Sequence, residues 1–375
     1  MLICCMKITF VLTFHLPEDE RIWYQQAQAL RNCGHEVSVI SSKTEKSNLP
    51  NVHCFNDSGL PKRLVISKII NFLCNINPDF TICDNPISVF AVRKFKKVTK
   101  NKTTIIYDVT ERYPSSLHLK NLNFCKKTIK FCAFTFISFL AGCFTDKFIF
   151  GEYHKSLFFR VLFPLKKYIY LPYFANVELI KQYPLSDISQ RCELFYSGNL
   201  TENSGFEQVL KVVERCAQKI PHTKFVLKII SNQDFDVEKK VNIENVEINF
   251  MKQLPFLDFC NEIGKSDIFL DLRKINFRKN RSLPIKIFYY LAAGRPVIYS
   301  ELKSIKRFFP KREWQNFGVL VNPNNFEEIV TIIENYINNK NFYNNCCSFS
   351  YELAHNKYQW NHIQEIFTDF IENND

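Results

Sequence analysis

The amino-acid sequence predicts an α/β protein with two doubly wound domains, and three observations support this prediction. The chain has 375 residues, of which 46% are apolar and 23% charged, so it is long enough to build two globular cores. Short, β-branched apolar runs recur along both halves of the chain, and helical patterns separate them. Most of these runs are continuous, as expected for parallel strands that are covered on both faces.

Each half of the chain contains six expected strands. In the first half they are residues 7–13, 36–41, 80–84, 103–109, 146–150 and 168–171. In the second half they are residues 193–197, 224–231, 246–250, 267–271, 296–300 and 318–321. Strands that alternate with helices form parallel sheets with crossover connections, so we expect two Rossmann-like sheets. Ligands of such sheets bind beyond the carboxyl ends of the strands, which predicts an active site in the cleft between the domains.

Helix boundaries can also be read from the sequence. One apolar face repeats at spacings of three and four across residues 206–220, which predicts an amphipathic helix. Asn325 followed by Glu328 is typical of a helix start. Gly34 predicts the end of the helix that contains Trp23.

We divide the chain into three parts on this basis. Residues 1–175 form an N-terminal Rossmann-like domain, and residues 176–355 form a second one. Residues 356–375 are expected to form a C-terminal helix that packs back on the first domain.

Charge and cysteine content limit the classes of partner. The 49 basic and 37 acidic residues give a net charge of +12, which favours anionic partners such as nucleotides, phospholipid headgroups or nucleic acid. No nucleic-acid recognition module is present, so nucleic acid is not an expected partner. The fourteen Cys show no Cys-x-x-Cys and no zinc spacing, which argues against a disulfide framework and against a metal site, and favours the reducing cytoplasm.

One apolar segment leaves two interpretations open. No uninterrupted apolar run reaches the roughly 18–20 residues that span a bilayer, so we expect no transmembrane helix. Residues 121–144 are rich in Phe and carry Lys126, Lys127 and Lys130 near their start. This segment is either a buried core helix or a helix that lies on a membrane surface.

A strand-to-helix turn in the second half is a candidate anion site. The apolar run 193–197 ends in Ser197-Gly198-Asn199, and a helix is expected from about Ser204-Gly205. Gly198 allows another group to approach the backbone closely, and the free amides at a helix start attract phosphate. The turn has no Gly-x-Gly-x-x-Gly pattern, and taken alone it is equally consistent with an ordinary connection.

The segment 282–298 gives the turn its context. It resembles the "P-x-K-x-x-E-Y-M-A-A-G-x-P-V-I" signature of the GT-B glycosyltransferases, in the family 4 (group 1) branch. The matching residues are Ser282-Leu-Pro284, Lys286, Ala292-Ala-Gly294 and Pro296-Val-Ile298.

Further motifs extend the resemblance to the whole chain. His15-Leu-Pro-Glu-Asp19-Glu-Arg21 followed by Gly34-His-Glu-Val37 is similar to the branch's opening segment. Tyr107-Asp-Val-Thr-Glu111 with Tyr113-Pro114 is similar to its "Y-D-x-H-E-x-Y-P" segment, and Gln359-Trp-Asn361 to its terminal helix.

The resemblance implies transfer of a sugar from a nucleotide donor, UDP- or GDP-linked, to an acceptor hydroxyl. The second domain would hold the donor and the first a saccharide or lipid-linked acceptor. The resemblance also implies a retaining reaction without a metal or other cofactor. We expect a role in surface polysaccharide synthesis (capsule, O-antigen or exopolysaccharide) in the cytoplasm, with peripheral contact at the inner face of the membrane.

The resemblance assigns site residues in both domains. The donor-binding residues are Gly198, Asn199, Arg273, Ser282, Lys286 and Tyr289. The catalytic residues are His15, Asp19 and Glu111. Structural roles remain open for several of them: His15 could orient its loop, Asp19 could start a helix with Arg21 as its surface partner, and Tyr289 could be a core aromatic residue.

The chain also departs from the family pattern. Arg281 and Tyr289 stand where many members have two glutamates, Ser204 replaces a lysine, and Thr110 replaces a histidine. Cations in the loop that contains Arg273, Lys274, Arg278 and Arg281 could restore the lost positive charge. The alternative is a non-catalytic GT-B partner or scaffold protein with a degenerate donor site.

Overall fold

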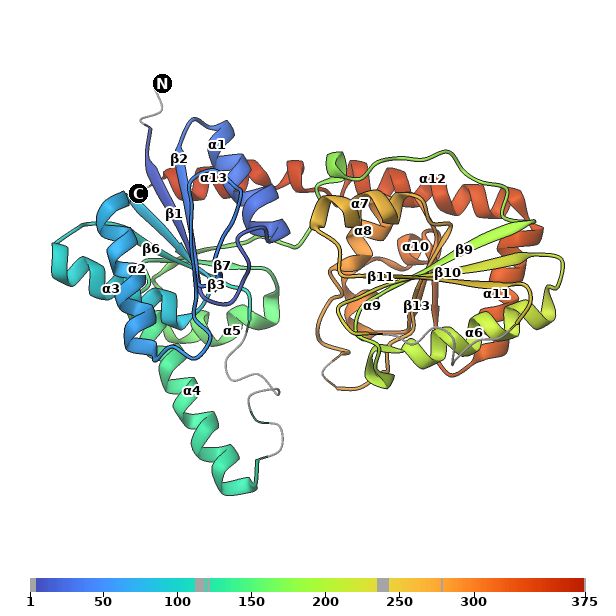
Figure 1. Cartoon of the computed structure of the whole chain (residues 1–375), viewed down its shortest axis with the longest axis horizontal. Helices are drawn as coiled ribbons and strands as arrows, with labels where there is room; N and C mark the ends of the chain where they lie inside the picture. The colour runs from blue at the N-terminus through green and yellow to red at the C-terminus, as the bar shows by residue number, and fades with distance from the viewer. Residues whose placement is uncertain (1–4, 112–118, 120–121, 235–242, 278, 374–375) are drawn as a thin grey trace. The chain divides into compact units, whose positions relative to one another are not determined.

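The computed structural model describes residues 5–111, 119, 122–234, 243–277 and 279–373. The chain forms two compact units, which are Met1–Tyr173 with Ile363–Asp375, and Phe174–His362 (Figure 1). Each unit is built on a parallel sheet with helices on both faces, which confirms the predicted fold class.

Within the described residues, the first unit contains an eight-stranded sheet in the order β3-β4-β2-β1-β5-β6-β7-β8. The strands are β1 Lys7–Leu12, β2 Glu36–Ser41, β3 Lys43–Thr44, β4 Val52–Asn56, β5 Phe80–Cys83, β6 Thr104–Val109, β7 Lys147–Phe150 and β8 Lys167–Tyr170. All neighbours are parallel except β3, which is antiparallel to β4. The sequence did not predict β3 and β4, because β4 is a half-buried strand whose His53 and Asn56 break the apolar pattern.

The first unit's helices form a layer on each face of the sheet. They are η1 Glu20–Ala27, α1 Gln28–Asn32, α2 Lys62–Ile76, α3 Pro86–Thr99, α4 Phe124–Phe144, α5 Tyr153–Leu162 and α13 Gln364–Glu372. One face packs against α2, α3, α5 and the end of α4, and η1, α1 and α13 lie together on the other. The η1 segment is a π-helix, a conformation that is frequent at functional sites. Gly34, with φ +85°, ends this helical region as predicted.

Helix α13 joins the first unit from the far end of the sequence. Lys147 Nζ donates to the carbonyl oxygen of Phe370 at 2.9 Å, and His35 Nε2 lies 2.9 Å from Glu372 Oε1. Both contacts tie the helix to strands or turns of the first sheet.

Within the described residues, the second unit contains a six-stranded, all-parallel sheet in the order β11-β10-β9-β12-β13-β14. The strands are β9 Arg191–Ser197, β10 Lys224–Ser231, β11 Val246–Lys252, β12 Ile268–Asp271, β13 Val297–Ser300 and β14 Gly318–Val321. All six were predicted within a few residues of their bounds, because five are apolar runs between polar turns and β11 alternates apolar and polar residues.

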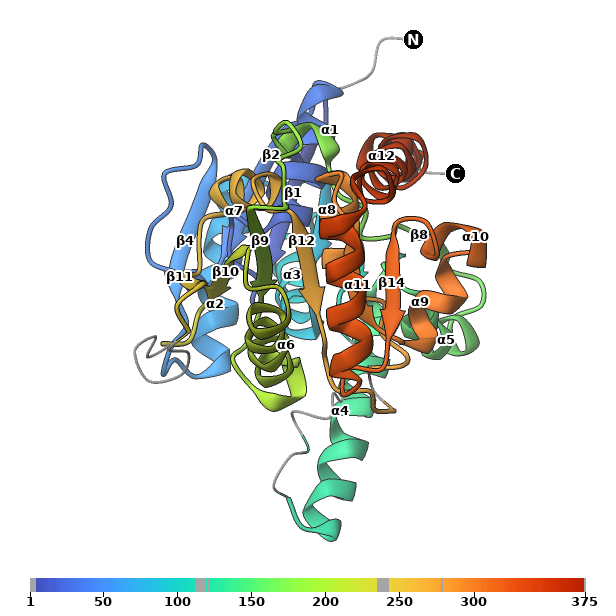
Figure 2. The ribbon, with the colours of Figure 1, turned by 90° about the vertical axis from the view of Figure 1, so that its right-hand side faces the viewer.

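The second unit's helices also cover both faces of the sheet. They are η2 Val177–Leu179, η3 Glu202–Ser204, α6 Phe206–Lys219, α7 Phe256–Gly264, α8 Lys286–Ala292, α9 Lys303–Phe308, α10 Lys311–Trp314, α11 Phe326–Asn338, α12 Lys340–Asn356 and η4 Trp360–His362. Leu194 and Tyr196 of β9 face α6 and α11, which lie side by side in Figure 2. Phe195 of the same strand faces α7 and α8 on the other side.

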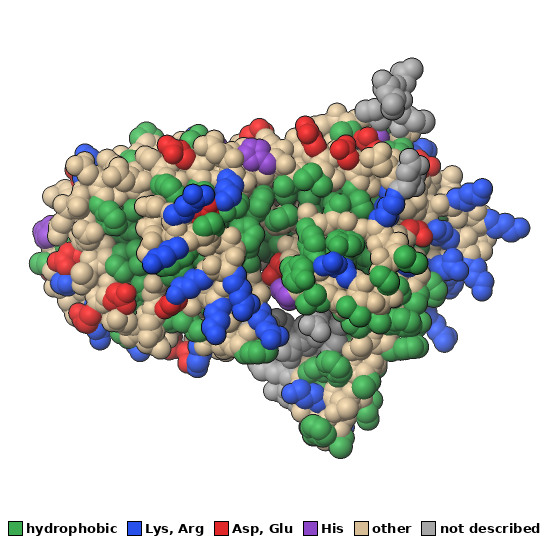
Figure 3. Space-filling model, turned by 180° about the vertical axis from the view of Figure 1, so that it is seen from behind, with side chains coloured by type: hydrophobic (Ala, Val, Ile, Leu, Met, Phe, Trp, Pro, Cys, Tyr) green, Lys and Arg blue, Asp and Glu red, His purple; other side chains and the backbone are tan. Residues whose placement is uncertain are grey.

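Helix α4 is long, apolar and mostly exposed. Its 21 residues are long and apolar enough, by length and composition alone, to cross a membrane, and only 17% of its apolar window is buried. Lys126, Lys127 and Lys130 lie in its first two turns, and most of the apolar residues follow them. Of the two interpretations of this segment, the buried core helix is wrong, since Figure 1 shows α4 extending away from the sheet and Figure 3 shows hydrophobic side chains exposed along it.

Gly205 should be far more sensitive to substitution than another glycine of the same unit. Its φ is +79°, and an added Cβ would lie 2.0 Å from the carbonyl oxygen of Leu272. At Gly294, φ is +66° and the nearest atom would be 3.3 Å away. Both substitutions by Ala carry the roughly 1–2 kcal/mol cost of a left-handed backbone. We expect Gly205→Ala to lower the free energy of unfolding by about 1–3 kcal/mol more than Gly294→Ala, as measured by denaturant titration. Equal losses would contradict the close approach of the two loops.

Candidate active site

A polar cavity lies at the point where the strand order of the second sheet reverses. From β9 the chain moves outward to β10 on one side, whereas β12 and β13 follow on the other side. Loops diverge at such a point and leave a crevice at the carboxyl ends of the strands. A cavity of 320 Å³ is found there, lined by Tyr196, Ser197, Gly198, Asn199, Ser204, Asp271, Arg273, Lys279 and Lys286.

Gly198 and Lys286 form one wall of this cavity. Lys286, the first residue of α8, donates from Nζ to the carbonyl oxygen of Ser197. An added Cβ at Gly198, where φ is +147°, would lie only 3.2 Å from that Nζ atom. The glycine therefore makes room for the lysine side chain, which confirms the close approach predicted at this turn.

Asp271 and Arg273 also line the cavity. Arg273 Nε donates to Asp271 Oδ1 at 2.6 Å, and Arg273 Nη2 donates to the Tyr299 hydroxyl at 2.8 Å. Burial would raise the pKa of Asp271, but the charge and hydrogen bonds of Arg273 outweigh it, with smaller contributions from Lys286 and Tyr299, and the pKa is lowered. The carboxylate thus stays ionised, and the Arg273 guanidinium is held in one orientation.

The charge of the cavity favours a multiply charged anion. Arg273, Lys279 and Lys286 contribute three cations, and Asp271 is the one carboxylate among the described lining residues. Its charge is already engaged by Arg273, so an excess of positive charge faces the cavity. Helix α6 begins directly after Ser204 and Gly205, and its first amides add a favourable dipole.

The structure brings together four of the six predicted donor-site residues, Gly198, Asn199, Arg273 and Lys286. The other two do not line the cavity. The carbonyl oxygen of Ser282 accepts a hydrogen bond from Ser304 Oγ at 3.0 Å. Tyr289 is 2% exposed, with its ring centroid 5.8 Å from that of Phe256, so the interpretation of this residue as a core aromatic fits the structure.

The loop cations lie in different places. Arg273 lines the cavity, but Lys274 pairs with Glu202 at 3.1 Å on the exposed surface. Arg281 lines a separate cavity, and Arg278 lies outside the described residues. The sequence did not single out Lys279 or Asp271. The sequence did contain a signal for Asp271. A carboxylate at the end of a buried strand is costly in a core, and this indicates that it faces a site.

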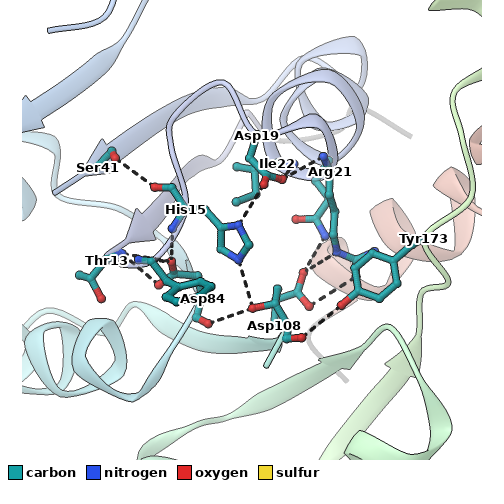
Figure 4. Close-up of polar contacts among 12 residues, drawn as sticks. Thr13, His15, Asp19, Arg21, Ile22, Ser41, Asp84, Asp108 and Tyr173 are labelled. Atoms are coloured by element: carbon teal, nitrogen blue, oxygen red, sulfur yellow. Dashed lines mark hydrogen bonds and ion pairs between the residues drawn. The ribbon is translucent and has the colours of Figure 1, made fainter. Parts of the chain in front are cut away.

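A second polar cluster lies at the corresponding point of the first sheet, where β1 and β5 diverge (Figure 4). His15 Nδ1 lies 2.9 Å from Asp19 Oδ2, and His15 Nε2 lies 3.2 Å from Thr110 Oγ1. Asp84 accepts hydrogen bonds from the amides of Thr13, Phe14 and His15 at 2.8–3.2 Å. Three strand ends therefore position one imidazole.

The electrostatics of this cluster favour the charged form of His15. Burial opposes protonation, but the hydrogen bond to Asp19 and the charges of Asp19, Asp84 and Asp108 outweigh it and raise the pKa of His15. The side chains of His15 and Asp19 remain 22% and 24% exposed, so both are accessible to a bound molecule. Asp19 also accepts from the amides of Arg21 and Ile22 and starts η1, so its helix-capping role is real.

Arg21 is not the surface partner that the sequence suggested. It is 4% exposed, its Nε donates to Asp108 Oδ2 at 3.0 Å, and its guanidinium lies 4.5 Å from the centroid of the Tyr173 ring. Gln26 Nε2 donates to the same carboxylate at 2.9 Å. The pairing is a buried one that fixes η1 against β6, so Asp108 has a structural role.

The third predicted catalytic residue is not part of the His15 cluster. Glu111 is exposed at the end of β6. Tyr113 and Pro114, which completed its motif, lie outside the described residues. Among the residues described, no group of three His, Cys, Asp or Glu side chains could hold a metal ion.

Comparisons with known proteins agree with this architecture. Residues 191–339 match a family model described as "Glycosyl transferases group 1". HepE from Anabaena, solved in complex with UDP, is 14% identical, with a TM-score of 0.68 over 98% of this chain and 99% of that chain. WaaG, a glycosyltransferase involved in lipopolysaccharide biosynthesis, is 14% identical, with a TM-score of 0.68 over 97% and 99%. A search of curated protein sequences found no match to this chain.

A sucrose-phosphate synthase from Thermosynechococcus elongatus is also similar in fold, at 13% identity and a TM-score of 0.67 over 98% of both chains. These matches define the fold of the chain, which is that of the GT-B glycosyltransferases. The residues that line the cavity at Lys286 all lie in the segment that matches the group 1 model.

The His15–Asp19 contact can be tested by titration. Because the pKa of His15 is raised, the contact stabilises the fold fully below the unfolded-state value of about 6.5 and loses this effect as pH rises through the folded-state value. Asp19→Asn keeps an oxygen for the helix start but removes the charge. We expect NMR to show a lower His15 pKa in this variant than in the wild type. Denaturant titration should show that the free energy of unfolding falls by roughly 1 kcal/mol at pH 5.5 and by less at pH 9.

Thr110→Val is the matched control, since it removes the Nε2 partner without changing charge. It should leave the His15 pKa raised. An unchanged pKa in Asp19→Asn would show that the imidazole does not depend on this carboxylate.

Proposed function

We propose that this chain is a glycosyltransferase that moves a sugar from a UDP- or GDP-linked donor to a saccharide or lipid-linked acceptor. The pathway that we propose is the synthesis of a surface polysaccharide. The observation that carries the proposal is the cationic cavity at the switch point of a group 1 glycosyltransferase domain. HepE, which shares the fold, has been solved with UDP, UDP-glucose, and UDP with glucose.

The cavity suits a nucleoside diphosphate in size and charge. Its 320 Å³ falls within the usual range of about 300–1,000 Å³ for small-molecule sites. Lys286, Arg273 and Lys279 all line it, so three cations are available to one bound molecule. Fixed cations stabilise the charge that develops on a departing diphosphate, which is usually the largest contribution to such a reaction.

The proposed reaction forms one bond and breaks one bond at the anomeric carbon. The acceptor oxygen bonds to this carbon as the bond to the β-phosphate oxygen breaks, and the acceptor proton passes to the departing phosphate. The new bond forms on the face that the phosphate leaves, so configuration is retained. The phosphate charge is met by lysine and arginine, and the proposed reaction therefore uses no metal or other cofactor.

We assign the acceptor to the first unit. His15 and Asp19 are accessible and hydrogen-bonded to each other, so they can orient an acceptor hydroxyl and accept a hydrogen bond from it. Glu111 is exposed at the end of the neighbouring strand and remains a candidate contact.

The donor site can be tested by thermal shift with UDP, GDP, CMP and dTDP sugars. We expect a UDP or GDP species to raise the melting temperature, and we expect Lys286→Met to weaken binding about tenfold or more, because a diphosphate contact is lost. Lys279→Met should weaken it as well. Lys274→Met is the matched control, since this lysine lies in the same loop but pairs with Glu202 outside the cavity.

Two outcomes would contradict the proposal. Binding that survives Lys286→Met would remove this residue from the phosphate site. A protein that binds none of the nucleotides would instead be the non-catalytic GT-B partner, an alternative that the replacement of the family's lysine by Ser204 supports.

We further propose that helix α4 places the enzyme on the cytoplasmic face of an anionic membrane, where a lipid-linked acceptor is found. Phe124, Ile129, Phe131 and Phe136 are 47–82% exposed along one projecting helix. Lys126, Lys127 and Lys130 lie in its first two turns, and all three are exposed. Anionic headgroups attract such lysines while the apolar side chains enter the acyl boundary, which favours a lipid surface over a protein partner.

Flotation with vesicles decides this point. Wild-type protein should float with phosphatidylglycerol-containing vesicles and less with pure phosphatidylcholine, and Lys126→Glu/Lys127→Glu/Lys130→Glu should remain at the bottom, because each lysine contributes about 1 kcal/mol near an anionic surface. The control Lys211→Glu/Lys311→Glu/Lys340→Glu makes the same change in net charge at exposed positions of the second unit. Equal behaviour of the two triple variants would exclude α4 as the membrane contact.

A further inference from the structure

A second cationic cavity lies beside the donor cavity and has no role in the function described so far. It has a volume of 240 Å³ and is lined by Phe277, Asn280, Arg281, Lys303 and Arg307. Three of these five residues are cations, and none is a carboxylate. Figure 3 shows Lys and Arg side chains gathered on this unit.

Within the described part of the chain, the cations of this cavity have no acidic partner in an ion pair. Lys306 lies on the same helix, α9, and forms an ion pair with Glu301. Among the described residues, no ion pair joins a carboxylate to Arg281, Lys303 or Arg307, and the cavity therefore offers positive charge to a bound molecule.

The loop that carries Arg281 is held in place. Asn280 Oδ1 accepts a hydrogen bond from the amide of Lys303 at 3.0 Å, and Ser304 Oγ donates to the carbonyl oxygen of Ser282 at 3.0 Å. The Arg281 guanidinium lies 3.9 Å from the centroid of the Phe277 ring, and stacking of this kind orients its donors. A fixed guanidinium binds a carboxylate or phosphate through two parallel hydrogen bonds.

The two cavities are neighbours along one loop. Lys279 lines the donor cavity, whereas Asn280 and Arg281, the next two residues, line the second one. Because these residues are consecutive in the chain, one loop contributes side chains to both cavities.

We infer that the second cavity binds an anionic group, a carboxylate or a phosphate, carried by the substrate saccharide. This inference rests on the proposed function and specifies its substrate class. The transferred sugar is the favoured bearer of the charge, since it is attached to the diphosphate beside Lys279. Arg281 stands where the family pattern has a glutamate, so a cationic hydrogen-bond donor replaces an anionic acceptor at this position.

The test compares paired donors by calorimetry. The pairs are UDP-glucuronate with UDP-glucose, and GDP-mannuronate with GDP-mannose. For the base that the protein binds, we expect the acidic sugar nucleotide to bind at least about tenfold more tightly than its neutral partner. Arg281→Gln/Arg307→Gln should remove this preference. Lys306→Gln, on the same helix but outside the cavity, should keep it.

If the protein binds the acidic and the neutral donor of each pair equally tightly, a second experiment tests whether the acceptor carries the acidic group. With the nucleoside diphosphate bound, D-glucuronate should then bind more tightly than D-glucose. This preference should disappear in Arg281→Gln/Arg307→Gln. The result would assign the acidic group to the acceptor. The inference is overturned if neither experiment shows a preference, or if a preference persists in the double variant. Binding of UDP or GDP without any such preference would overturn this inference alone, whereas no nucleotide binding would overturn the proposed function with it.

Discussion

The reversal of strand order within each parallel sheet is the constraint on which the candidate sites depend. Where two neighbouring strands send their crossovers to opposite faces, no helix can close the space at their carboxyl ends. In the second sheet this point lies between β9 and β12, and in the first between β1 and β5. Polar groups that would be costly inside either core are accommodated there, because the diverging loops leave them access to water or to a ligand.

Internal ion pairs then determine which charges remain available. Asp271 holds Arg273 in one orientation, and Asp108 does the same for Arg21 beneath the His15 cluster. Each carboxylate lies at or near a strand end and engages one guanidinium. The consequences differ, however: Arg273 still reaches a cavity, whereas Arg21 is buried and serves the fold. An Asp–Arg pair therefore lines a cavity in the second unit and stabilises the fold in the first.

The sequence predicted the sheets better than the surfaces. Apolar patterns located twelve strands, and most of these are buried on both faces, although β8 and β11 are not; half-buried β4 left no such pattern. Gly198 and Lys286 could be found from a family motif, but Lys279 could not, since its position depends on the path of a loop. The exposure of α4 was also beyond prediction, because an apolar helix has the same composition whether neighbours cover it or not. The burial of Tyr289 could not be predicted either, because it depends on the position of this residue on α8 and not on the residue type.

The docking of α13 on the first unit has a consequence for biosynthesis. This unit is assembled from Met1–Tyr173 and Ile363–Asp375, so its last element leaves the ribosome only after the whole of the second unit. Until then, the surface of η1 and α1 that α13 covers is exposed to solvent and to other nascent chains. The first unit can therefore be completed only after the second unit has been translated. During synthesis, chaperones would bind the amino-terminal half of the chain.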